Sequence, residues 1–308
     1  MNRDNRKKKN TAYHTAKGSP AGRKNKGGKA GERYYAFFDA EYTCYMDNDR
    51  DFDRSHSNEV LSVGLVISDR SFHLVETFYS PVRPVYNPRL TRYCKSLTGL
   101  TQEEIDHAPS WEEVFEEMYR LLQEYPVKEI LVWGSDAKTL TDDLEKNHFR
   151  PLKKPRVFIG MVRDVTKRLT ARVFGNGMTV SLADMKYVCN MEHHTAHNAL
   201  EDAMDLYRIA KACVEESYSE KRAEKLYSYI QERNTYHQFR RFKHPEKFGQ
   251  PAADREMKQA SLDYIKVVRE VYSRQKQEIP TEILAFMDDV RSLVGMSSVE
   301  CPKLEEDD

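Results

Sequence analysis

A short apolar run that ends in two acidic residues constrains the fold of this chain more than any other feature. In YYAFFDAEYTC, residues 34–44, five apolar or aromatic residues precede Asp39 and Glu41. Because alternate side chains of a strand project from one face, a strand here would hold both carboxylates together at the edge of a core. Two carboxylates this close raise each other's pKa unless a cation lies between them. The stretch predicts a strand that ends at a divalent metal site; the alternative is an ordinary pair of acids at a strand end.

Two further acids follow apolar elements later in the chain. Asp136 comes after KEILVWG, residues 128–134, at the expected start of a helix, where an N-cap role is the alternative. In the helix expected near 198–214, Asp202 lies roughly 40° from Leu206, at the edge of an apolar stripe. Asp205 is expected to face water. An acid at the edge of a core needs a partner or a cation, so Asp202 is a third candidate ligand.

A histidine precedes the third acid by five residues. If both residues were helical, His197 and Asp202 would lie roughly 140° apart. His197 can therefore meet the same site only from the loop before the helix, which is a suitable place for a proton-transfer group.

The remaining pattern indicates an α/β domain. Residues 59–68 and 72–80 are rich in Val, Leu and aromatics and are separated by a tight turn, which predicts two antiparallel strands. Residues 110–124 are apolar at helical spacing. RVFIG, residues 156–160, is expected to be a short strand before a helix from Met161 to Phe174. Capping boxes are predicted at three Ser/Thr and acid pairs, Thr101 with Glu104, Ser110 with Glu113 and Ser181 with Asp184.

The two ends of the chain differ from this domain. Residues 1–32 hold ten Lys and Arg against two acids, which predicts a disordered tail. Such a tail either binds phosphate backbones or serves only as a solubilising or address segment. The predicted division is therefore a basic tail 1–32, an α/β domain 33–215, a charged helical extension 216–295 and an acidic flexible tail 296–308.

The location is expected to be cytoplasmic. No segment approaches the roughly 20 apolar residues of a membrane helix, and the N-terminus lacks the apolar core of a secretory signal. The five cysteines are dispersed and form no CxxC pair, which favours reduced thiols and argues against a zinc site.

The order of these acids and the histidine resembles the DEDDh 3′–5′ exonucleases of the DnaQ-like superfamily. FFDAEYTC, VWGSDAKTL and HNALEDA are similar to its three motifs, over about residues 33–213. RPVYNPRLTRYCKSLTGLTQEEID is similar to the ERI-type and KapD-type branch. The resemblance implies an RNase H-like fold, a mixed five-stranded sheet flanked by helices, here with a helical C-terminal extension.

The resemblance also implies an activity and a role for each residue. The protein would be a 3′–5′ exonuclease that releases nucleoside 5′-monophosphates from single-stranded RNA or DNA 3′ ends. Asp39 would bridge two Mg²⁺ or Mn²⁺ ions, Glu41 and Asp202 would hold the ion that activates water, and Asp136 would hold the second. Neutral His197 would accept the proton of the attacking water.

Further residues are substrate-binding candidates. The backbone around Ala40, Tyr42 and Thr43 would contact the terminal 3′ hydroxyl, as the resemblance implies. Leu100 in LTGLT would wedge against the terminal base, or is an ordinary core leucine. HQFRRFKHPEKF, residues 237–248, either binds single strands or packs its phenylalanines. The competing function is a non-catalytic nucleic-acid-binding or regulatory protein on a nuclease fold, against which the intact set of five residues argues.

Overall fold

The computed structural model describes residues 33–134, 136–144, 153–192 and 198–243, with short pieces between 263 and 288. The chain divides into two compact units, with the boundary between Ser219 and Glu220. The first unit holds the sheet and helices α1 to α8, and the second contains α9 (Glu220–Lys243). The predicted tails at 1–32 and 296–308 lie outside the described residues, as do the side chains of the basic and aromatic run 237–248. The predicted four-part division of the chain stays a prediction.

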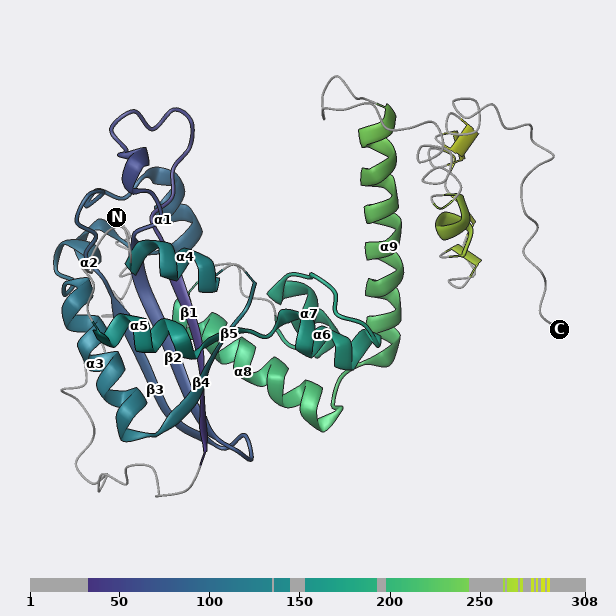
Figure 1. Cartoon of the computed structure of the whole chain (residues 1–308). Helices are drawn as coiled ribbons and strands as arrows, with labels where there is room; N and C mark the ends of the chain where they lie inside the picture. Colours follow the sequence, from purple (N-terminus) through teal and green to yellow (C-terminus); the bar gives the residue numbers. More distant parts are fainter. Residues whose placement is uncertain are drawn as a thin grey trace, which may run out of the picture. The chain divides into compact units, whose positions relative to one another are not determined.

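A mixed sheet of five strands, in the order β3-β2-β1-β4-β5, forms the centre of the first unit (Figure 1). β1 (Tyr34–Tyr42), β2 (Val60–Asp69) and β3 (Leu74–Pro81) pair as an antiparallel meander. β4 (Val127–Val132) runs parallel to β1, and β5 (Val162–Asp164) runs parallel to β4. The predicted fold class and the predicted antiparallel pair are confirmed.

Within the described residues of the first unit, eight α-helices connect and flank these strands. They are α1 (Arg92–Thr98), α2 (Gln102–Asp106), α3 (Trp111–Glu124), α4 (Asp136–Asp143), α5 (Lys153–Met161), α6 (Thr166–Phe174), α7 (Leu182–Val188) and α8 (Ala199–Glu215). A short 3-10 helix, η1, spans Arg54–His56. All three predicted capping boxes form, at the starts of α2, α3 and α7. None of the described helices combines the length and the hydropathy that a transmembrane span requires.

The fifth strand lies later in the chain than the sequence indicated. Residues 156–160, predicted as a strand, are helical and belong to α5, and β5 follows at Val162–Asp164. Phe158 is fully buried while its neighbour Val157 is 44% exposed, as expected for a helix that packs one side against a core. A short apolar run does not distinguish a buried strand from a helix, which is why the prediction was wrong. The helix expected from Met161 begins at Thr166 instead.

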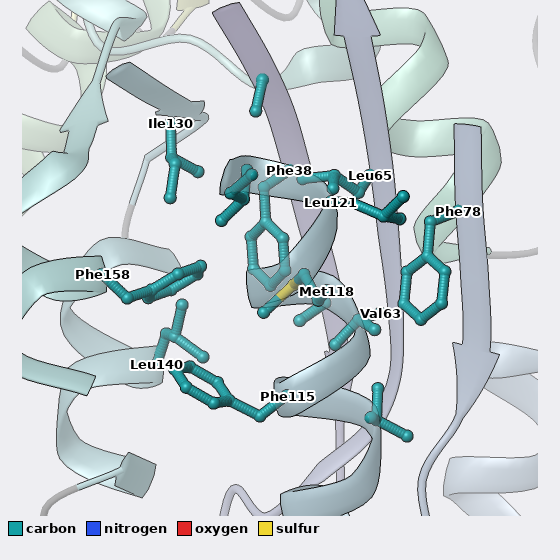
Figure 2. Close-up of a cluster of buried hydrophobic side chains, with 14 of the residues drawn as sticks. Phe38, Val63, Leu65, Phe78, Phe115, Met118, Leu121, Ile130, Leu140 and Phe158 are labelled. Atoms are coloured by element: carbon teal, nitrogen blue, oxygen red, sulfur yellow. The ribbon is translucent and has the colours of Figure 1, made fainter. Parts of the chain in front are cut away.

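The two faces of β1 have different surroundings. Ala36, Phe38 and Ala40 belong to the main core, where the ring of Phe38 meets that of Phe158 edge to face at 6.0 Å (Figure 2). Phe37 contacts Tyr207 of α8, with the ring centroids 5.4 Å apart. Because side chains alternate along a strand, Asp39 and Glu41 project from the same face as Phe37, toward α8.

Candidate active site

Three predicted site residues converge at the carboxyl end of β1. Asp39 and Glu41 of β1 and Asp202 in the first turn of α8 each offer a carboxylate oxygen, and these oxygens all lie within 4.8 Å of one another. Carboxylate oxygens are the ligands that hard divalent cations such as Mg²⁺ and Mn²⁺ prefer. The cluster could therefore hold a metal ion.

A glycine in β2 lets α8 reach this cluster. Gly64 is the register partner of Asp39 across the β1–β2 pair. A Cβ atom on Gly64 would lie 2.1 Å from the carbonyl oxygen of Ala199 and 2.4 Å from the amide nitrogen of Leu200. Only a residue without a side chain allows the start of the helix to touch the sheet here. Gly64 was not among the predicted site residues, although a single glycine inside a strand pattern, SVGLV, is a known signal of close backbone approach.

The start of α8 is fixed by its own cap. The side-chain oxygen of Asn198 accepts hydrogen bonds from the amides of Leu200 and Glu201, each at 3.1 Å. Ala199 and Ala203 are fully buried, so small side chains lie on the face that meets the sheet. An acid in the first turn also interacts favourably with the positive end of the helix dipole, which suits Asp202.

The expectation that Asp205 faces water is wrong. Its side chain is 2% exposed and forms an ion pair with Lys186 of α7, whose side chain is 7% exposed. Arg208 lies 3.4 Å from the second carboxylate oxygen. Asp205 lies away from the sheet but faces α7, which covers a second side of α8 and was not predicted to pack there. This pair holds the two helices together and is separate from the acid cluster.

Asp136 begins α4 directly after β4. Because β1 and β4 are parallel neighbours, their carboxyl ends meet at one edge of the sheet, where the acid cluster also lies. The turn before α4 is held by Gly134 (φ +69°), whose amide donates to the hydroxyl of Thr166 at 2.9 Å and to Asp164 at 3.2 Å. The side chain of Asp136 and all of His197 lie outside the described residues, so their roles stay predictions.

The candidate substrate residues differ in exposure. Ala40 and Thr43 are buried, Tyr42 is half-buried, and Leu100 is 7% exposed. Leu100 packs in a second buried cluster with Leu61, Leu90, Cys94 and Ile105, which agrees with the core-leucine alternative. The contacts of these four residues with a nucleotide stay predictions.

Two thiols, Cys44 just after β1 and Cys94 of α1, lie next to each other. The Cys44 thiol donates a hydrogen bond to the Cys94 sulfur, and this bond, together with burial, holds the pKa of Cys44 well above its ordinary value. The hydroxyl of Thr91 donates to the carbonyl of Cys44 at 2.8 Å and accepts the amide of Cys94 at 3.0 Å. The start of α1 is thereby fixed against the segment that follows Glu41.

Comparison with known proteins agrees with this fold. The family model described as Exonuclease matches residues 36–210, more than half of the chain. The "3′-5′ exonuclease eri1" of Schizosaccharomyces pombe is 33% identical over 114 residues, which cover 37% of this chain and 36% of that protein. The "Probable 3′-5′ exonuclease KapD" of Bacillus subtilis is 34% identical over 159 residues, which cover 50% of this chain and 72% of that protein. The chain thus spans little more than a third of the first relative.

A solved structure shows the same fold. It is described as "3′-end specific recognition of histone mRNA stem-loop by 3′-exonuclease" and superposes with a TM-score of 0.50 at 23% identity. The match covers 59% of this chain and 64% of that one. The resemblance to RNase H-like 3′–5′ exonucleases of the ERI and KapD type is confirmed. The chain belongs to the Exonuclease family.

Proposed function

We propose that this protein is a metal-dependent 3′–5′ exoribonuclease, able to act on DNA as well, that releases nucleoside 5′-monophosphates. The observation that carries the proposal is the convergence of Asp39, Glu41 and Asp202, from two elements distant in the sequence, within 4.8 Å. The family match spans all three residues. A protein that only binds nucleic acid has no need of such a cluster of acids.

Two Mg²⁺ or Mn²⁺ ions are the proposed cofactors, and the cluster of carboxylate oxygens supports metal binding. Asp39 would bridge both ions, Glu41 and Asp202 would complete the first site, and Asp136 would contribute to the second. Such ions supply an activated water and stabilise the charge that develops on the leaving 3′ oxygen. The chain's own part would be to hold these carboxylates at one edge of the sheet. The Gly64 contact brings the start of α8 against β2 beside Asp39, and the hydrogen bond from Gly134 to Thr166 fixes the chain before α4.

His197 is the proposed general base. A histidine side chain ordinarily changes protonation state near neutral pH, so His197 would be able to accept a proton from the attacking water. It directly precedes Asn198, the N-cap of the helix that carries Asp202.

The substrate is proposed to be a single-stranded 3′ end. Recognition of a histone mRNA stem-loop belongs to the structural neighbour and makes RNA the first substrate to test. Residues 33–215 are the proposed catalytic domain, and the proposed location is the cytoplasm. In the proposed complex, Leu100 wedges against the terminal base, and the backbone around Ala40, Tyr42 and Thr43 contacts the terminal 3′ hydroxyl.

The test is an assay of shortening on 5′-labelled single-stranded RNA and DNA with Mg²⁺ or Mn²⁺. We expect a ladder of products that shorten by one nucleotide from the 3′ end, with 5′-monophosphates released. Asp39→Asn should lower the rate by about three orders of magnitude or more, because it removes the bridging carboxylate. Glu116→Gln, which changes an exposed acid of α3 outside the cluster, is the matched control and should keep the wild-type rate.

A second measurement separates the enzyme from the binding alternative. Mn²⁺ at about 100 times its dissociation constant should stabilise the folded protein by about 2.7 kcal/mol, and Asp39→Asn should lose most of this gain. A wild-type protein that binds RNA, shows no metal-dependent rise in melting temperature and leaves the RNA intact would establish the non-catalytic alternative. Equal shortening by Asp39→Asn would assign the activity to a contaminant.

A further inference from the structure

A loop between β3 and α1 displays two large apolar side chains. Val85 and Tyr86 are 60% and 42% exposed. Pro84 and Pro88 flank them in RPVYNP, and proline restricts both its own backbone and that of the residue before it. Adjacent exposed apolar residues on a stiff segment are a candidate binding surface.

A buried carboxylate holds this loop. Glu59 is fully buried, and its Oε1 accepts the amides of Val85 and Tyr86 at 2.7 and 2.9 Å. Its Oε2 accepts the backbone amide of Asn87 at 2.7 Å and the side-chain amide of Asn87 at 3.2 Å. A carboxylate is costly to bury unless its lone pairs are satisfied, so the four bonds fix both the acid and the loop.

The same glutamate ties the loop to the strand that carries the acids. The Glu59 amide donates to the hydroxyl of Thr43 at 3.0 Å, and the Thr43 amide donates to the Glu59 carbonyl at 2.8 Å. Thr43 follows Glu41 by two residues. The end of β1 is therefore connected to Tyr86 by the hydrogen-bonded pair Thr43 and Glu59 and by the buried Glu59 side chain.

One further contact orients the tyrosine ring. The rings of His56 and Tyr86 stack with centroids 3.6 Å apart and an interplanar angle of 13°. The side chain of Asn87 donates to the carbonyls of His56 and Asp53 at 3.0 and 3.2 Å, which fixes η1 against the same loop. The ring of Tyr86 is thereby oriented before any ligand binds, which lowers the entropic cost of stacking on it.

The charge of this segment favours a polyanion. Residues 82–102 contain four basic residues and no aspartate or glutamate. The basic residues are Arg83, Arg89, Arg92 and Lys95, and all four are exposed. Exposed cations among aromatic side chains are typical of surfaces that bind single-stranded nucleic acid, where phosphates pair with the cations and bases stack on the rings.

We propose that Tyr86, backed by His56 and flanked by Val85, is the stacking site for a base of the substrate strand upstream of its 3′-terminal nucleotide. Glu59 is a positioning residue that holds this site against the end of β1. The inference rests on the proposed exonuclease function and adds to it a second contact that recognises strand length.

The test compares kcat/KM on a ten-nucleotide RNA with kcat/KM on a dinucleotide. In Tyr86→Ala the ratio of kcat/KM on the ten-nucleotide RNA to kcat/KM on the dinucleotide should fall about tenfold. The longer RNA would lose the stacking of one base on the Tyr86 ring, whereas the dinucleotide is too short to reach this ring. Tyr86→Phe should keep the wild-type ratio, since it retains an aromatic ring. Tyr187→Ala, which removes a tyrosine of α7 that is 41% exposed, is the matched control and should also keep the ratio.

The outcomes separate the two proposals. A wild-type enzyme that shortens the ten-nucleotide RNA while Tyr86→Ala keeps the wild-type ratio would overturn the stacking site alone. A wild-type protein that cleaves neither RNA would overturn the exonuclease function, and the stacking site with it.

The positioning role of Glu59 has its own test. Glu59→Gln should lower the same ratio, and adding it to Tyr86→Ala should cause no further loss, because both act on one contact. Losses that multiply in the double variant would overturn the positioning role. Circular-dichroism melting shows whether Glu59→Gln folds; if it does not, the Tyr86 comparison still decides the stacking site.

Discussion

Replacing Gly64 with alanine tests how the acid cluster is assembled. The added Cβ would lie 2.1, 2.2 and 2.4 Å from backbone atoms of Ala199 and Leu200, whereas ordinary van der Waals contact begins at 3.4 Å. The helix start must therefore retreat by about 1.3 Å, the difference between 3.4 and 2.1 Å, since no flexible side chain is available to move aside. Overpacking of this kind typically costs about 1–3 kcal/mol in the free energy of unfolding.

The shift should affect the metal site more than the fold. Asp202 is three residues beyond Ala199 in the same helix and moves with it. Mg²⁺ requires oxygens at about 2.0–2.1 Å in near-ideal octahedral geometry, so a displacement of about 1.3 Å removes one ligand. We expect Gly64→Ala to remain folded, to lose most of the rise in melting temperature that Mn²⁺ gives the wild type, and to lose at least about 100-fold in kcat.

The matched control is Gly160→Ala in α5. A Cβ at Gly160 meets nothing within 4 Å, so the substitution should be tolerated. Because glycine is unfavourable in a helix, the control should gain about 0.5–1 kcal/mol of stability and keep the wild-type metal response. If Gly64→Ala also kept that response and the wild-type kcat, the glycine contact would not be what positions Asp202.

Further predictions concern features around the site. Lys186→Met should cost about 3–5 kcal/mol in urea unfolding, since it leaves the buried Asp205 carboxylate without its main cation, and adding Asp205→Leu should restore most of the loss. Thr166→Val should reduce activity more than Thr166→Ser, because valine cannot accept the amide that fixes the turn before α4. The Asp53 carboxyl should titrate in NMR with a midpoint near 2 rather than 3.8, because the Ser55 hydroxyl and then the neighbouring histidine lower its pKa to about 2. Its stabilising effect is complete above about pH 4 and is lost as the pH falls toward 2; Ser55→Ala should move the midpoint back toward 3.8.

Local patterns predicted most of the fold. The apolar run before Asp39, the two aromatic-rich strands after it and the capping boxes each depend on a few neighbouring residues, and each forms as predicted. The resemblance to DEDDh exonucleases implied that Asp39, Glu41 and Asp202 share a site, and the structure brings their carboxylates together. Their catalytic roles remain predictions.

Features that depend on contacts between distant elements were not predicted. Residues 156–160 have an apolar composition that suits a strand, but the chain places them as a helix on the core. The burial of Asp205 depends on a second helix, α7, that a helical-wheel argument does not include. Gly64 and Glu59 contact backbone atoms of residues far along the chain, Ala199 and Val85 respectively. A local sequence pattern does not show which distant backbone atoms a residue will contact.

The alternation along β1 constrains how this protein can vary. Even-numbered positions such as Phe38 pack in the main core, while the odd-numbered Asp39 and Glu41 form part of the acid cluster. A single inserted or deleted residue within the strand would exchange the two faces, moving carboxylates into the hydrophobic core and aromatic rings into the acid cluster. Evolution and protein engineering can therefore substitute residues on either side independently, but changes of length must be confined to the loops beyond each end of the strand.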